Sequence, residues 1–290
     1  MEKYELLIDD TIDVFGVTLF RIKALISFGN VEKGALGGYV EKEDNLSHYG
    51  NAWVYGDAWV YGNAEVYGNA EVSGNAMVYG NAEVYGDAMV YGDARVSGNA
   101  RVSGNAEVSG NAEVYGNARV YGDAMVYGDA MVYGDAMVYG DARVSGNAWV
   151  YGDARVSGDA MVYGVARVSG NAMVYGDAMV YGNAEVYGDA MVYGVARVSG
   201  NAEVYGNAEV SGNAEVYGDA DYMIFKNHWS SGRYFTYTKS NKMWKVGCFY
   251  GTDQELIEKA YKDSEVSGKN YEAYVKFVEK LEEINNEKHN

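Results

Sequence analysis

The chain has 290 residues, with 23 Lys and Arg against 41 Asp and Glu, so its formal net charge is −18. Such a charge argues against nucleic acid and anionic membranes as main partners, because both are negative themselves. A single cysteine excludes an internal disulfide, no apolar run reaches the length of a membrane span, and the start MEKYELLIDD lacks a signal-peptide pattern. We therefore expect a soluble, cytoplasmic protein without a membrane partner.

The first 50 residues lead into a repeat without belonging to it. Residues 1–32 are expected to form a β-hairpin cap, with apolar strands around 4–8 and 17–26 and a turn at Gly16. Residues 33–50 predict an irregular first coil, because Leu36 falls in a Val position of the extrapolated repeat while Lys42 and His48 fall in the next two. We expect a structural role for His48 in this coil.

From 51 to 218 the chain divides into 28 hexads of the form [N/D]-A-x-V-[Y/S]-G, with no insertion or deletion. Alternation puts Ala and Val on one side of a short strand and the third and fifth residues on the other. Gly followed by Asn or Asp predicts a corner. Three strands and three corners bring the chain back above its start, so rungs pair in parallel and residues eighteen apart stack. At Val165 and Val195, which replace Asn or Asp, we expect strain because β-branched residues resist positive φ.

The hexads resemble the repeat of left-handed parallel β-helices, in which an aliphatic residue and a small residue two places before it fill a triangular prism. The resemblance covers 51–218 and implies the left hand, which spacing alone does not show. The expected fold is an all-β solenoid, a three-sided (left-handed) parallel β-helix over 33–220. The hairpin cap precedes it, and a small α+β domain at 221–290 follows. About nine coils give a rod of roughly 45 Å.

Stacking eighteen apart predicts a face on which Arg95 lies under Glu113 and Arg167 under Glu185. Throughout the array, all nine Met hexads have Tyr at the fifth position, and six of the seven Arg hexads have Ser. Duplication of a few cassettes explains this pattern, and so does selection for an adhesive surface. The second interpretation predicts a homo-oligomer, a dimer or a trimer. Its self-association face comprises Trp59, Tyr61, Met77, Tyr79, Tyr115, Met131, Tyr133, Trp149 and Tyr151.

The repeat stops after Asp219. Three strands are predicted between 222 and 251, with Ser240 and Asn241 turning the last pair. Thr252 and Glu255 form a capping box, which predicts that a helix begins there. A second helix over 269–284 has one apolar stripe.

The C-terminal strands are basic and aromatic. Between Tyr222 and Tyr250 there are five basic residues, no acidic residue and nine aromatics, whereas the hexads have a net charge of −13. This sheet could bind an anion or a nucleic-acid strand by charge and stacking. Alternatively it docks on acidic solenoid surface with its aromatics as core. We expect a patch for an unknown protein partner here, formed by Trp229, Ser230, Ser231, Arg233, Lys242 and Trp244.

Several segments together resemble a group of largely uncharacterised bacterial and phage proteins, some labelled as transferases from their fold. These segments are RIKAL (21–25), KGALGGYVEKEDNLS (33–47), the hexads and GCFYGTDQEL (247–256). Ala35 stands where that group favours a charged residue. The resemblance spans nearly the whole chain and implies no established activity.

Three functions fit these patterns. Many left-handed hexapeptide proteins are acyltransferases with a histidine base and a loop ejected from the coils, but His48, His228 and His289 lie outside the uninterrupted array. An acidic rod that mimics nucleic acid, or another phage-type inhibitor, is a further alternative. We favour a non-catalytic structural or interaction protein, a rigid rod that self-associates and presents its C-terminal domain for recognition. We expect no metal site and no cofactor.

Overall fold

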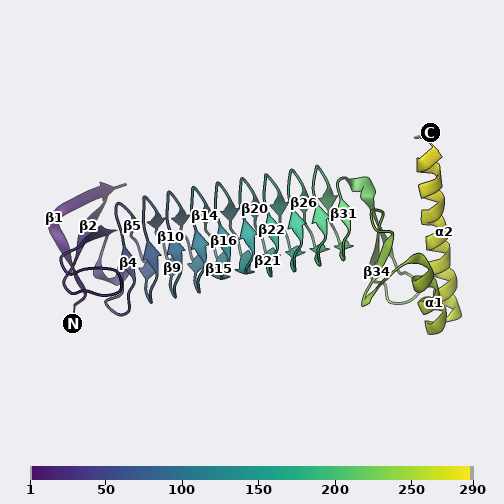
Figure 1. Ribbon diagram of the computed structural model, residues 1–290, viewed down its shortest axis with the longest axis horizontal. Coiled ribbons are helices and arrows are strands. Elements are labelled where there is room, and N and C mark those ends of the chain that lie inside the picture. Colours follow the sequence, from purple (N-terminus) through teal and green to yellow (C-terminus); the bar gives the residue numbers. More distant parts are fainter. Residues whose placement is uncertain (1, 288–290) are drawn as a thin grey trace.

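The computed structural model describes residues 2–287 and shows a parallel β-solenoid with a hairpin at one end and a small α+β domain at the other (Figure 1). Each hexad contributes one strand made of its third and fourth residues, from β4 (Trp53–Val54) to β31 (Glu215–Val216). Only β15 (Arg119–Gly122) and β18 (Met137–Gly140) are longer. The predicted fold class is confirmed.

Every third strand belongs to the same sheet, so the rod has three faces. The cap face is a twelve-stranded sheet that starts with β1 (Tyr4–Val14), β2 (Val17–Ala24), β3 (Leu36–Val40) and β5 (Trp59–Val60) and ends at β29 (Glu203–Val204). The groove face has nine strands, from β6 (Glu65–Val66) to β30 (Glu209–Val210), and the open face has ten, from β4 to β31. Arg95 pairs with Glu113 on the cap face and Met89 with Glu107 on the open face, so residues eighteen apart stack as predicted.

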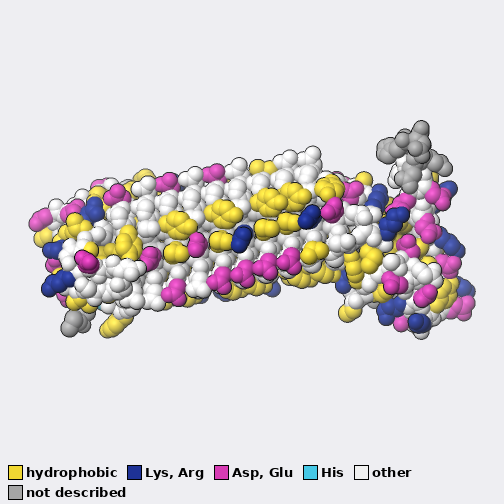
Figure 2. Space-filling view, viewed as in Figure 1, with side chains coloured by type: hydrophobic (Ala, Val, Ile, Leu, Met, Phe, Trp, Pro, Cys, Tyr) yellow, Lys and Arg dark blue, Asp and Glu magenta, His cyan; other side chains and the backbone are white. Residues whose placement is uncertain are grey.

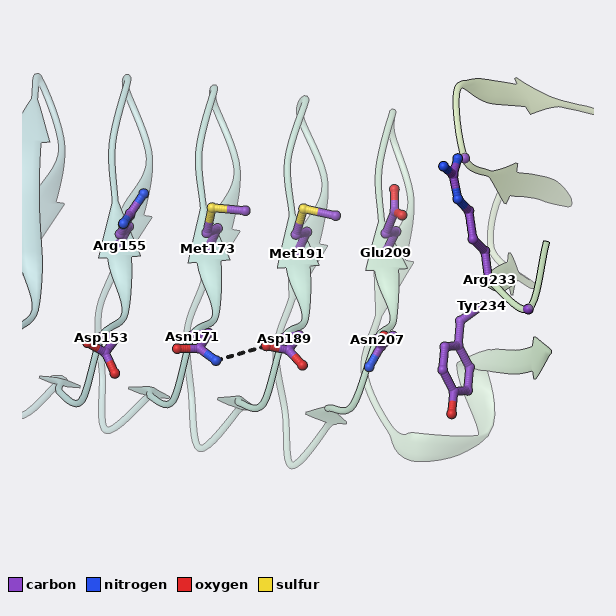
Figure 3. A pocket seen from close by; sticks show the side chains of 12 residues that line it. Asp153, Arg155, Asn171, Met173, Asp189, Met191, Asn207, Glu209, Arg233 and Tyr234 are labelled. Atoms are coloured by element: carbon purple, nitrogen blue, oxygen red, sulfur yellow. Dashed lines mark hydrogen bonds between the residues drawn. The ribbon is translucent and has the colours of Figure 1, made fainter. Parts of the chain in front are cut away.

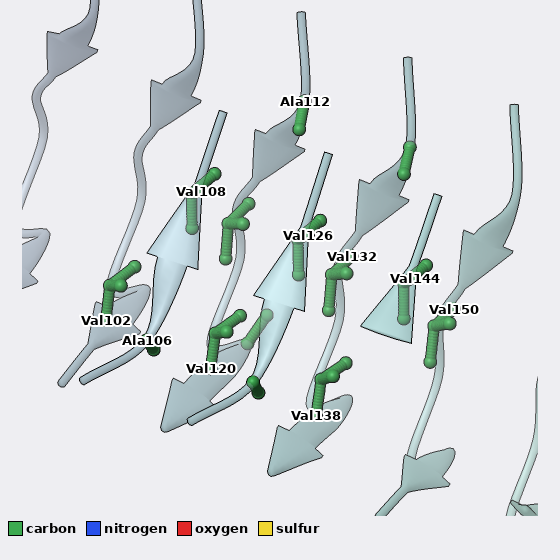
Figure 4. Packing of buried hydrophobic residues seen from close by; sticks show 14 of the residues in the cluster. Val102, Ala106, Val108, Ala112, Val120, Val126, Val132, Val138, Val144 and Val150 are labelled. Atoms are coloured by element: carbon green, nitrogen blue, oxygen red, sulfur yellow. The ribbon is translucent and has the colours of Figure 1, made fainter. Parts of the chain in front are cut away.

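The Ala and Val side chains of the hexads fill the interior of the rod. None of them, from Ala52 to Val216, has any exposed surface. Figure 4 shows the valines of successive coils lying in rows inside the three sheets. The predicted division into inward and outward residues is confirmed.

The corners turn at glycine. Gly164 and Gly194 have φ of 78° and 74°, and the valines that follow them are not among the residues with positive φ. The amides of Val165 and Val195 donate to the next coil at 2.9 Å, the same range as other corners. The expectation of strain is wrong, because the glycine and not the following residue takes the left-handed conformation.

The N-terminal cap is the predicted hairpin, but the first coil differs from expectation. β1 (Tyr4–Val14) and β2 (Val17–Ala24) pair antiparallel, and β3 (Leu36–Val40) and the short 3₁₀ helix Glu43–Asn45 follow. Val40 pairs with Val60 and Leu46 bridges to Val66, a spacing of twenty instead of eighteen. Val40 and Leu46 therefore point inward, while Leu36 is 56% exposed. The extrapolated register for Leu36 is wrong because the first coil holds two more residues than the others.

After a 3₁₀ turn at Asp219–Asp221, the C-terminal domain has four strands instead of three. The predicted turn at Ser240 and Asn241 joins the second and third strands, and Gly247, with φ of 55°, makes a turn to a fourth. The sheet order follows the chain. The strands are β32 (Tyr222–Lys226), β33 (Tyr234–Thr238), β34 (Met243–Val246) and β35 (Phe249–Gly251).

Two helices cover one side of this sheet. α1 (Asp253–Asp263) begins after Thr252, whose side chain caps it as predicted. α2 (Glu265–Glu287) begins four residues before the predicted start. The shared core contains Phe235, Tyr237, Trp244, Leu256, Ala260, Tyr271, Val275 and Val278.

The C-terminal segment also closes the end of the rod. Within the rod, third-position amides donate to an Ala carbonyl of the next coil, which the last coil lacks. Side-chain oxygens substitute on all three faces, at 2.7–2.9 Å. The amides of Glu203, Glu209 and Glu215 donate to Asp219 Oδ1, Thr236 Oγ1 and Ser240 Oγ, respectively. Each third-position amide of the last coil thus has a hydrogen-bond acceptor, and these strand edges are capped.

Candidate functional site

The C-terminal sheet docks on the rod with the side that the helices do not cover. Thr236 is buried there, and Lys245 Nζ lies 3.8 Å from Glu209 Oε2 and over the Tyr193 ring. Tyr222 also donates from its hydroxyl to the carbonyl of Glu203. Of the two interpretations of this basic, aromatic sheet, the structure shows docking on the chain's own solenoid. Its buried aromatics cannot serve as a stacking platform for nucleic acid.

The six residues predicted to form a partner-binding patch do not lie together. Trp244 has no exposed surface, and Trp229 packs against Tyr271 in the core, so both indoles serve the domain interior. Lys242 lies at the far end of β33 and β34, 3.8 Å from Glu282. Ser230, Ser231 and Arg233 remain as one exposed cluster in the loop before β33.

This loop forms one end of a groove of about 900 Å³ between the groove face and the C-terminal domain (Figure 3). Third-position side chains of four successive coils make its floor, namely Arg155, Met173, Met191 and Glu209. Corner side chains line one side, namely Asp153, Asn171, Asp189 and Asn207. Gly232, Arg233, Tyr234 and Gly247 close the end.

The charges of the groove are only partly balanced inside it. Asn171 donates to Asp189 at 2.9 Å, and Glu209 is occupied by Lys245 and by the Tyr193 hydroxyl. Among the described residues, Arg155 and Arg233 have no ion pair. They lie at opposite ends of the two methionines, and Arg155 is three coils, or about 14 Å, from the last rung.

This arrangement can hold a ligand with an apolar middle and acceptors toward its ends. Guanidinium groups bind carboxylates well, and methionine adapts to irregular apolar shapes. The four floor residues do not include a nucleophile beside a general base, the pair that covalent catalysis needs. Sequence reasoning identified Arg233 but missed Arg155, Met173 and Met191, because nothing in a hexad says which coil the C-terminal domain overhangs.

The predicted self-association face is partly used by the rod itself. Trp59 and Tyr61 pack against the hairpin cap with Val14 and Leu19. Tyr115, Tyr133 and Tyr151 stack on one another with ring centroids 4.9–5.0 Å apart, and Tyr61 stacks on Tyr79 at 5.1 Å. Met77, Met131 and Trp149 lie on the same face, half-buried. The predicted ion pairs are present, at 3.2 Å for Arg95 and Glu113 and 2.9 Å for Arg167 and Glu185.

The described histidines make structural contacts. His48 Nδ1 accepts from the Lys3 amide at 3.1 Å, and its ring stacks on Tyr4 at 4.3 Å. His228 lies in the loop after β32, where its ring meets the edge of Trp229. Neither lines the groove. His289 lies outside the described residues.

Comparison with known proteins supports the repeat. The family model described as YdcK Beta solenoid repeat matches seven segments of the rod, at 82–98, 94–110, 112–128, 118–134, 130–146, 136–152 and 166–182. Their starts differ by multiples of six, so the matches follow the hexads. The chain is similar to this β-solenoid repeat family over the middle of the rod. No curated protein matches the chain.

The helices and the acidic, histidine and cysteine side chains of the described residues bear on two other site classes. Neither helix combines the length and the apolar character needed to cross a membrane. Between residues 2 and 287, no three or more His, Cys, Asp or Glu side chains converge in a way that could hold a metal ion.

Proposed function

We propose that this protein is a non-catalytic structural protein, a rigid rod of fixed length that associates with copies of itself and presents a C-terminal domain for recognition. The observation that carries the proposal is the continuity of the rod. Its interior is fully buried from Ala52 to Val216, and hydrogen bonds connect every coil to the next up to the capped end. A solenoid of this kind holds its ends at a fixed separation.

The rest of the surface supports an interaction role over an acyltransferase role. The rod wall repeats the same few side chains, and the half-buried His48 is held by Lys3 and Tyr4. An acyltransferase needs a base that can reach an acceptor hydroxyl or amine. The groove beside Arg233 instead offers two methionines on its floor and two guanidinium groups that have no ion pair among the described residues, and this combination suits recognition of a protein segment.

Sedimentation velocity of the full chain over micromolar to submillimolar concentrations tests self-association. We expect a reversible shift from the 31.7 kDa monomer to a dimer or trimer. A monomer at every concentration would overturn self-association. Micromolar binding of acetyl-CoA that is lost in His48→Ala or His228→Ala would instead favour the acyltransferase alternative.

Recognition is tested separately. Arg233→Glu reverses an exposed charge at the end of the groove, and Ser231→Ala changes the same loop without changing charge. A partner recognised through the groove should be lost with Arg233→Glu and kept with Ser231→Ala. A partner that both variants keep would place recognition elsewhere.

A further inference from the structure

The open face differs from the other two faces in how its tyrosines are arranged. On the cap and groove faces, seven tyrosine pairs stack rung on rung. On the open face one such pair occurs, Tyr163 with Tyr181. Tyr91 and Tyr127 have serine on both neighbouring coils, so their rings are uncovered and 38% and 40% exposed. These rings are not used to stabilise the rod by stacking.

Large and small side chains are coupled within each rung of this face. Met89, Met125, Met161 and Met179 share their hexads with tyrosine, whereas Glu71, Glu107, Arg143 and Arg197 share theirs with serine. From Glu71 to Met161 the two kinds of rung alternate strictly. The surface of this face is therefore uneven: rungs with Met and Tyr project from the sheet, and the rungs between them project less at the position of serine.

One edge of the open face carries an acidic ladder. Asp123, Asp141, Asp159 and Asp177 occupy the same corner of four successive coils, about 4.8 Å apart. Figure 2 shows acidic side chains in a row along one edge of the rod, beside a mixed row of apolar and charged ones. At the same height, the opposite edge carries Asp129, Asn147, Val165 and Asn183, so it has fewer charges.

We propose that the open face is a homodimer interface in which two rods lie parallel about a two-fold axis that runs along them; this rests on the self-association proposed above. Such an axis places each rung opposite the same rung of the other copy. It also sets the acidic edge of one open face against the opposite edge of the other. The third position of one copy then faces the fifth position of the other. Methionine meets tyrosine, a favourable sulfur–aromatic contact, and the long Arg143 meets the small Ser145.

Charge selects the parallel orientation. An antiparallel pair would bring the four aspartates of one copy against the same four of the other, and like charges at such distances repel. The parallel pair sets Asp141 and Asp177 against Asn147 and Asn183 and Asp159 against Val165, so like charges face each other only at Asp123 with Asp129 and at Asp87 with Asp93. Val165, on the coil after Asn147, offers the Asn147 amide no side-chain acceptor, so that amide is free to donate to a partner carboxylate.

The spacing between rungs favours a second copy of this chain as the binding partner over a helix or an extended strand. Contacts that repeat at about 4.8 Å match another β-solenoid, whereas an α-helix repeats at about 5.4 Å and an extended strand at about 6.8 Å for two residues. Trp53 is buried against Phe28 of the cap, so the exposed part of the face runs from Glu71 to Glu215 and is about 38 Å long. At a width of about 13 Å it is smaller than a standard interface, so we expect a weak dimer.

The chain contains matched variants for a test. Residues 123–140 are three identical hexads, DAMVYG, which place Met125 on the open face, Met131 on the cap face and Met137 on the groove face. We expect Met125→Glu to raise the dimer dissociation constant about tenfold or more, because it places two charges in the interface. Met131→Glu and Met137→Glu should change it less than about twofold.

Sedimentation of the three variants separates the outcomes. If Met125→Glu dimerises like the native chain, the open face is not the interface, while self-association itself stands. If Met131→Glu dissociates the dimer instead, the cap face is the interface. A native chain that never dimerises overturns both this inference and the self-association on which it rests.

Spin labels test the orientation. We replace Cys248, the exposed native cysteine, with Ser and then introduce Asn75→Cys or Asn201→Cys, at corners of one edge seven coils apart. A parallel dimer should give a short label separation, below about 25 Å, at both sites. An antiparallel dimer would separate both pairs by about 34 Å or more, and that result would overturn the proposed axis.

Discussion

At the scale of single residues, the rod depends on a strict separation of two side-chain environments only one residue apart. Val138 has no exposed surface, while Met137 beside it points outward between Arg119 and Arg155 of the neighbouring coils. The interior is lined by Ala and Val throughout, so a buried charge there would find neither water nor a partner.

Val138→Asp should therefore destabilise the rod severely, by several kcal/mol in the free energy of unfolding. Met137→Asp is the matched control. Its free energy of unfolding should stay within about 0.5 kcal/mol of the native value, because the new carboxylate is outside the rod and lies between Arg119 and Arg155. Thermal unfolding followed by circular dichroism measures both. Equal effects of the two substitutions would contradict the assignment of inside and outside.

A second residue-scale prediction concerns Lys3, which is buried in the cap with its Nζ 2.8 Å from the Ala52 carbonyl. Burial lowers the pKa of Lys3 from 10.5 to about 8. Between these values the unfolded chain binds more protons than the folded one, so stability rises with pH. From pH 7 to pH 9.5 the native chain should gain up to about 2 kcal/mol relative to Lys3→Met.

Urea unfolding of both chains at several pH values provides this comparison. The difference between the two chains isolates Lys3 from the tyrosines. A difference that does not vary with pH would show that Lys3 titrates normally in the fold.

At the scale of elements, the ends of the three sheets are the places where the repeat cannot satisfy itself. The cap continues one sheet with β1, β2 and β3, and three side-chain oxygens close the other end. Thr236 is the buried one among these acceptors: it is 1% exposed, and its hydroxyl accepts from the Glu209 amide at 2.9 Å.

Thr236→Val removes that acceptor without changing the shape of the side chain. The Glu209 N–H is then left buried and unpaired, at a cost of about 1–3 kcal/mol. We expect faster hydrogen exchange at the Glu209 amide, measured by NMR. Thr236→Ser keeps the hydroxyl and should keep the protection; if Val and Ser behave alike, the hydroxyl is not the acceptor that matters.

At the scale of the whole molecule, every coil built of hexads has the same Ala and Val interior, so these coils should be interchangeable. Both junctions depend on the residues next to them: the first coil at one end and the last three hexads with the C-terminal domain at the other. Stability of such a solenoid is close to a sum over repeats and their contacts. The face on which a hexad lies is set only by its count along the chain.

Deletions in the middle of the rod test this directly. Removing residues 123–140 should leave a folded rod about 4.8 Å shorter with a similar melting temperature. Removing 123–128 should also leave a folded rod, but with the C-terminal domain turned by one face relative to the cap. Removing 126–130 joins Met125 to Met131 and leaves DAMMVYG, which breaks the alternation between Ala124 and Val132 and should destabilise the array severely. X-ray scattering and thermal melting distinguish the three, and a folded five-residue deletion would contradict the hexad rule.

How much could be predicted from the sequence depended on how local the chemistry was. Alternation of Ala and Val, glycine corners and the spacing of eighteen are written in each hexad, so the fold, the buried set and the pairs of Arg95 with Glu113 and Arg167 with Glu185 could be predicted before the structure. The capping box at Thr252 and the hairpin turn at Gly16 are local in the same way. Their outcome hardly depends on distant parts of the chain.

Only the tertiary structure decided the features that join distant residues. The two additional residues of the first coil are visible only from the pairing of Val40 with Val60, because the irregular segment carries no repeat to extrapolate. Arg155 and Arg233 share a groove because the C-terminal sheet docks over one particular face, a choice made by buried contacts such as Thr236 with Glu209. The periodic sequence determines the structure of each rung. The contacts at the two ends of the rod determine which face continues into the cap and which face the C-terminal domain covers.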